Sequence, residues 1–157
     1  MKPLGDWLAR ALALHQQGQF GEAERLYAKI LKVDRRNFDA LHLLGLAKHQ
    51  QGDDAEAERL IGAALKIKPN FSDALLNYGS VLSSLQRHEE ALSYFDRAVA
   101  LSPQSARAVN NRGNALASLR RFDEAFASFD RALAIDPNHA NTLINRGYTL
   151  VDLGRYA

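Results

Sequence analysis

The sequence predicts an all-α protein built as a stack of antiparallel helical hairpins. Three observations support this prediction. Proline recurs at Pro69, Pro103 and Pro137, which are 34 residues apart (103 minus 69 and 137 minus 103). Apolar residues follow the spacing of amphipathic helices. Ala and Leu recur throughout, Val and Ile are sparse and only 8% of residues are aromatic, which favours helix over strand.

Four further columns keep the same period, and each contains one residue type. They are Gly45, Gly79, Gly113 and Gly147; Ala23, Ala57, Ala91 and Ala125; Ala64, Ala98 and Ala132; and Glu22, Glu56, Glu90 and Glu124. Together with the prolines they define a single domain of repeats. The repeats are 4–37, 38–71, 72–105 and 106–139, with the first helix of a fifth at 140–157.

Each repeat contains two amphipathic helices, which are clearest in the third. Leu75 and Leu82 mark its first helix, and Ala91 and Phe95 mark its second. Pro103 ends the hairpin because proline lacks the amide donor and clashes with a continuing helix. The same pattern places two helices in each of the other full repeats.

The two ends of the array depart from this pattern. In the first repeat Ala11 replaces the glycine and Arg35 replaces the proline, as is common in an atypical end repeat. The sequence stops at Ala157, where a further second helix should begin. We therefore expect a fragment of a longer repeat protein.

The glycine column predicts where the two helices of each hairpin cross. Glycine inside a helix costs about 1 kcal/mol relative to alanine. Four glycines in register therefore indicate that the two helices approach each other too closely for any side chain. The residues expected to fill the space opposite are Tyr27, Ile61, Phe95 and Phe129.

These columns resemble the tetratricopeptide repeat (TPR) across essentially the whole chain. The residues that carry the resemblance are Trp7, Leu41, Leu75, Leu82, Leu116 and the Gly, Ala and Pro columns. The resemblance implies a right-handed superhelical solenoid whose first helices line a concave groove. One departure is arginine at a usually apolar site, at Arg10, Arg112 and Arg146. We expect Arg112 and Arg146 to pair with an acid of the adjacent second helix, such as Asp96 or Asp130.

Charge and composition restrict the class of function. Twenty Lys and Arg against eighteen Asp and Glu give a net charge of +2 with the signs interspersed, so nucleic acid is not an expected partner. No signal peptide or membrane span is visible, and we expect a cytoplasmic protein without membrane contact. No catalytic motif is present, and we expect neither enzymatic activity in this segment nor a cofactor.

The groove side of the first helices is rich in amides and hydroxyls. Asn77, Asn111 and Asn145 lie 34 residues apart (111 minus 77 and 145 minus 111), although Asn is a mediocre helix former. An amide offers a donor and an acceptor, so a row of them can follow an extended backbone. The row resembles the asparagine ladder in the superhelix of O-linked N-acetylglucosamine transferases. Alternatively, these amides bond between neighbouring helices and orient the stack.

Other polar residues on the same stripe are candidates to shape ligand preference. They are His42, His49, Ser80, Asn110, Asn114 and Tyr148. Arg107 is the one cation of the stripe, so a clamp for a terminal carboxylate is not expected. His15, His42 and His49 are interpreted as solvated surface rather than a metal site. The acidic run from Asp53 to Glu58 is interpreted as a solvated helix start.

These features predict a protein–protein interaction scaffold that binds an extended peptide in its groove. A first alternative is the substrate-recruiting arm of a larger enzyme, such as a protein O-glycosyltransferase. A second alternative is a self-assembly element that forms a homo-oligomer through an open apolar face at Leu143, Leu150 and Leu153.

Overall fold

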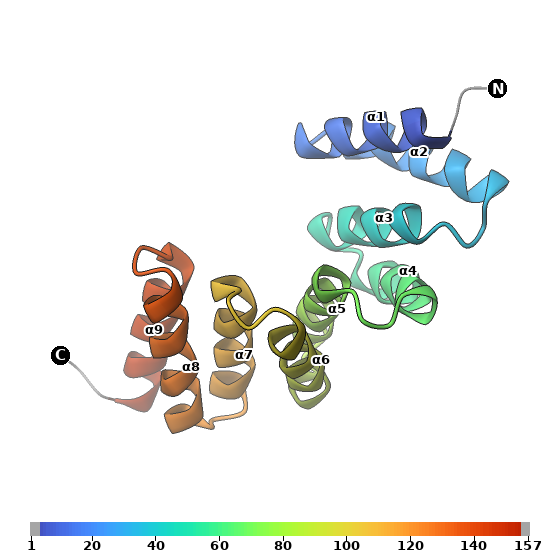
Figure 1. Ribbon diagram of the computed structural model, residues 1–157. Coiled ribbons are helices and arrows are strands. Elements are labelled where there is room, and N and C mark those ends of the chain that lie inside the picture. The colour runs from blue at the N-terminus through green and yellow to red at the C-terminus, as the bar shows by residue number, and fades with distance from the viewer. Residues whose placement is uncertain (1–3, 155–157) are drawn as a thin grey trace.

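The computed structural model describes residues 4–154, and this part of the chain is folded into nine α-helices joined by short turns (Figure 1). The first helices are α1 (Leu4–Gln16), α3 (Phe38–Gln50), α5 (Ser72–Ser84), α7 (Ala106–Ser118) and α9 (Ala140–Leu153). The second helices are α2 (Phe20–Val33), α4 (Asp54–Ile67), α6 (His88–Leu101) and α8 (Phe122–Ile135). None of these helices has the length and apolar character that crossing a membrane requires.

The helices form a curved stack of antiparallel hairpins. Within the described residues, α1, α3, α5 and α7 each contact their own second helix and also the first helix of the next repeat, whereas no two second helices contact each other. The stack must therefore curve toward the first helices. Figure 1 shows this arc, with α1, α3, α5 and α7 along its inner side and α4 and α6 along its outer side. The fold is a superhelical solenoid, and its inner face is built from first helices.

The glycine column lies where the two helices of a hairpin approach most closely, as the sequence predicts. A Cβ atom added to Gly79 would lie 2.6 Å from Cε1 of Phe95, and one added to Gly113 would lie 2.6 Å from Cε1 of Phe129. Ile61 fills the corresponding space opposite Gly45. The side chains of Ile61, Phe95 and Phe129 are almost fully buried, so the helix crossings form the core of the stack.

A turn residue in the left-handed backbone region joins the two helices of each full hairpin. Gly18 and Gly52 have φ values of +74° and +83°, and Gln86 and Arg120 have φ values of +61° and +59° at the equivalent positions. Glycine adopts this conformation without strain, whereas Gln and Arg do so at a cost. The backbone path is therefore kept through all four turns although the residue type changes.

The seams between consecutive hairpins carry matched sets of side chains, and successive members of a set are spaced 16 positions apart (112 minus 96 and 128 minus 112). At the seam between the third and fourth repeats, Arg112 donates to Oδ1 of Asp96 (2.6 Å) and to Oγ of Ser128 (2.8 Å). At the following seam, Nε of Arg146 donates to Oδ1 of Asp130 (3.0 Å). The arginine pairings expected from the sequence are confirmed.

The earlier seams have different residues at the same three positions. Between the first and second repeats they are Ala28, Leu44 and Leu60, and between the second and third repeats they are Gly62, Tyr78 and Tyr94. The rings of Tyr78 and Tyr94 pack edge to face with centroids 4.7 Å apart. One seam is thus apolar, one is aromatic and two are ionic.

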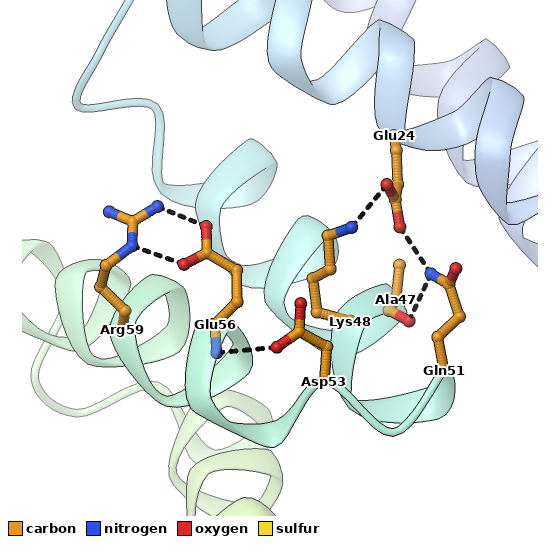
Figure 2. A network of polar contacts seen from close by, with 7 residues as sticks. All are labelled: Glu24, Ala47, Lys48, Gln51, Asp53, Glu56 and Arg59. Carbon is orange, nitrogen blue, oxygen red and sulfur yellow. Dashed lines mark hydrogen bonds and ion pairs between the residues drawn. The ribbon is translucent and has the colours of Figure 1, made fainter.

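The acidic run at the start of α4 belongs to a polar network (Figure 2). Asp53 caps the helix by accepting a hydrogen bond from the amide of Glu56 (3.3 Å), and Glu56 pairs with Arg59 (2.6 Å). Lys48 and Gln51, at the end of α3, both bind the carboxylate of Glu24 on α2. The predicted helix start is confirmed. The bonds of Lys48 and Gln51 to Glu24 also join the first hairpin to the second.

Other members of the run are less solvated than the sequence suggests. Asp54 and Glu58 are half-buried and pair with His49 (2.5 Å) and Arg87 (2.6 Å) respectively. These partners come from the neighbouring first helix and from the next hairpin's turn. Their proximity depends on the packing of the stack.

Candidate functional site

The predicted site residues lie on the first helices, spread over the inner face from α3 to α9. His42, Asn77 and Asn110 are buried, with 7%, 9% and 3% of their surfaces exposed. The half-buried candidates are His49, Ser80, Asn111, Asn114 and Asn145. Tyr148 on α9 is the most exposed, at 69%.

Polar contacts connect neighbouring first helices, and the partners are usually 35 residues apart. Asn77 Nδ2 lies 2.9 Å from His42 Nε2, and Asn145 Nδ2 donates to Asn110 Oδ1 at 3.0 Å. Between α1 and α3, His15 Nε2 lies 2.7 Å from Oε1 of Gln50. The hydrogen bonds between helices that the sequence leaves as an alternative role for the asparagines are therefore present.

Asn111 departs from this pattern because Leu76 occupies its partner's position. Leu76 is equivalent to His42 and Asn110 in the neighbouring repeats, but its side chain cannot form a hydrogen bond. Asn111 Nδ2 instead donates to Oγ of Ser80, one turn further along α5, at 3.4 Å. Asn111 Oδ1 also accepts a hydrogen bond from Nδ2 of Asn110 at 3.2 Å, so Asn111 is held by its neighbour on α7 and only by a long bond to α5.

A polar hollow opens on the inner face beside Asn111. It has a volume of about 190 Å³, and its lining residues are His49, Ser80, Ser83, Ser84, Phe95, Asn111 and Asn114. Three hydroxyls and two amides can donate and accept hydrogen bonds there. The nearby Arg107 pairs with Asp73 at 3.0 Å, so its charge is compensated. The hollow can bind uncharged polar groups such as peptide units.

A second, more apolar hollow lies on α1 and α3. Its volume is about 510 Å³, and Leu12, Phe20, Leu43 and Leu46 contribute apolar walls. His15, Gln16, Gly18 and Gln50 complete the lining. The inner face therefore changes along the stack from apolar at α1 and α3 to polar at α5 and α7.

The prediction of solvated histidines is wrong for His15 and His42. They are 8% and 7% exposed because each lies where one first helix contacts the next. Burial lowers the pKa of His42, so its imidazole is held neutral beside Asn77. His15 lies 3.4 Å from the hydroxyl of Tyr27, and burial raises the pKa of Tyr27 to about 12. Among the described residues, no group of three His, Cys, Asp or Glu side chains could hold a metal ion.

Family models match most of the chain. Tetratricopeptide repeat models cover residues 14–76, 55–106 and 76–140. The chain belongs to the tetratricopeptide repeat family. Tetratricopeptide repeats are typically non-catalytic scaffolds for protein–protein interaction.

Solved structures of TPR proteins share the fold. YrrB, described as a TPR protein with an unusual peptide-binding site, is 27% identical with a TM-score of 0.79, over 95% of this chain and 77% of YrrB. MamA from Desulfovibrio magneticus RS-1 is 21% identical with a TM-score of 0.87, over 99% of this chain and 88% of that one. PilF of Pseudomonas aeruginosa is 22% identical with a TM-score of 0.86, over 98% and 70%. No curated protein matches the chain in sequence.

Two groups of residues with functional potential were not among the sequence candidates. Ser83 and Ser84 line the polar hollow next to the candidate Ser80. Their positions on the groove side of α5 were the sequence signal that could have identified them. Tyr78 and Tyr94 line a hollow on the outer face, and no pattern in the TPR columns marks that site.

Proposed function

We propose that this TPR protein binds an extended peptide segment of a partner protein along its inner face. The observation that carries the proposal is the polar hollow beside Asn111 and Asn114. An extended peptide presents a donor and an acceptor at each residue, and the amides and hydroxyls of the hollow complement both. Peptide binding by YrrB, the most similar in sequence of the three structures compared above, supports the proposal.

The candidate residues have different parts in this proposal. Asn111 and Asn114 contact the peptide directly from the hollow, with His49 at its edge. Within the described part of the chain, Oδ1 of Asn77 and Oδ1 of Asn145 accept no hydrogen bond, so each can receive a backbone N–H. The buried His42 and Asn110 orient these two amides, and Tyr148 contacts the end of the peptide.

Replacement of Asn111 and Asn114 by alanine is expected to weaken peptide binding about thirtyfold, since each of the two lost hydrogen bonds contributes on the order of 1 kcal/mol. A random dodecapeptide library would be selected on the wild-type protein. Fluorescence anisotropy would then give the dissociation constants of the enriched peptides. Raising the salt concentration should change these constants little because the hollow is uncharged.

The matched control is Glu89→Ala, which removes an exposed side chain of the second helix α6. It should bind as the wild type does, and circular dichroism should show equal helicity for all variants. Enriched peptides that bind the double variant with unchanged affinity would contradict the proposal.

A second candidate function, self-assembly, is favoured by the exposed apolar side chains of α9. Leu143, Ile144 and Val151 are 52%, 52% and 55% exposed, and a Cβ atom at Gly147 would meet nothing within 4 Å. If these residues join two copies, Ile144→Lys with Val151→Lys should shift a dimer to a monomer in analytical ultracentrifugation. A wild-type protein that stays monomeric at all concentrations would exclude this function.

A further inference from the structure

The aromatic seam opens a hollow on the outer face of the stack. Two adjoining depressions of about 510 and 270 Å³ share Gly62, Lys66 and Tyr78. The first also contacts Ala55 and Ala63, and the second is bounded by Tyr94 and Arg97. The hollow therefore lies over α4, α5 and α6, on the side of the second helices and away from the groove.

The other seams show why this hollow exists. Gly62 occupies the position that Ala28, Asp96 and Asp130 hold in the other repeats. Two of these equivalents extend a carboxylate to an arginine across the seam, whereas Gly62 leaves the surface beside Tyr78 open.

Steric crowding does not account for the glycine. A Cβ atom at position 62 would lie 3.4 Å from Cε2 of Tyr78, which is an ordinary van der Waals contact. Glycine destabilises the interior of a helix relative to alanine, and the φ of Gly62 is an ordinary helical one. The chain therefore keeps a destabilising residue whose visible effect is an open hollow.

Cations and phenol groups surround the hollow. Within the described residues, Lys66 forms no ion pair, and Arg97 donates only to the carbonyl oxygen of Pro69 (2.8 Å). Burial raises the pKa of Tyr78, so its hydroxyl is a donor at neutral pH. The acidic group in the lining, Glu58, is already paired with Arg87 (2.6 Å). Arg59 is likewise paired with Glu56.

We propose that this hollow is a second binding site, which takes an acidic segment of a partner protein with one aromatic side chain. The aromatic ring would enter the space above Gly62 and pack on Tyr78 and Tyr94. Flanking carboxylates would pair with Lys66 and Arg97, which the protein leaves without acidic partners. This site does not depend on peptide binding in the groove.

The experiment is an NMR titration of the protein with the peptide Glu-Glu-Tyr-Glu-Glu, compared with Lys-Lys-Tyr-Lys-Lys and Glu-Glu-Ser-Glu-Glu. Only the first peptide should give saturable amide shifts, and these should centre on Gly62, Lys66 and Tyr94. Gly62→Leu fills the hollow and should weaken binding at least about tenfold. Lys66→Ala should weaken it up to about fivefold.

The variants separate this site from folding and from the groove. Gly62→Leu should melt at or above the wild-type temperature because leucine is the better helix former, so lost binding cannot result from unfolding. The Asn111→Ala, Asn114→Ala protein should bind Glu-Glu-Tyr-Glu-Glu normally. Equal shifts with the lysine peptide, no saturable shifts, or unchanged affinity of Gly62→Leu would overturn the proposal.

Discussion

Replacing Phe95 with alanine is expected to destabilise the protein by about 3–5 kcal/mol, the usual cost of removing a buried aromatic ring. Phe95 is 2% exposed and fills the space above Gly79 in the third hairpin. Glycine contributes no side chain, so position 79 cannot fill the cavity that the alanine leaves. The free energy of unfolding would be measured by urea denaturation followed by circular dichroism.

The control for Phe95 is Tyr148→Ala. Tyr148 is also aromatic, but 69% of its surface is exposed, so its loss should change stability by less than about 0.5 kcal/mol. If Phe95→Ala also costs less than about 1 kcal/mol, the helix crossings are not the stabilising core described above.

Gly79→Ala is expected to destabilise the protein although alanine is the better helix former. The added Cβ would lie 2.6 Å from Cε1 and 2.8 Å from Cδ1 of Phe95, closer than atoms pack. Overpacking a core costs about 1–3 kcal/mol, which exceeds the gain of about 1 kcal/mol in helix propensity. Thermal and urea denaturation would measure the net loss.

Gly147→Ala is the matched test because Gly147 belongs to the same column. A Cβ at this position would meet nothing within 4 Å, so helix propensity should stabilise α9 by up to about 1 kcal/mol. The two substitutions are chemically identical and should have opposite signs. The same sign for both would mean that contact with the second helix does not explain the glycine column.

The sequence alone predicts the backbone of this protein well. The glycine column locates the crossings of α3 with α4, α5 with α6 and α7 with α8, because a close approach restricts one position to one residue type. The arginines at the seams are also predictable, because each needs an acid within reach. A crossing depends on one glycine column, and the arginine–aspartate pairs recur with the repeat, so the columns reveal both.

The chemistry of the two faces is less predictable because it depends on pairs of residues in different repeats. His42 is buried beside Asn77 of the next repeat and against the rings of Phe38 and Phe71. Asn111 bonds to Ser80 rather than to the position 35 residues before it because Leu76, in another helix, cannot form a hydrogen bond. The left-handed turn at Gln86 and Arg120 is also not predictable from the sequence, since neither residue type indicates a positive φ. Such features can be identified only when the distances between helices are known.

The three kinds of seam restrict which repeats can be deleted from this protein. A deletion of residues 72–105 would keep the 34-residue period, but it would place Gly62 opposite Arg112 and remove the acid that Arg112 binds. Most of the side chain of Arg112 would still be shielded from solvent, without its charged partner. The hairpins on either side of the aromatic seam are therefore not interchangeable modules, because joining seams of different kinds removes a matched partner.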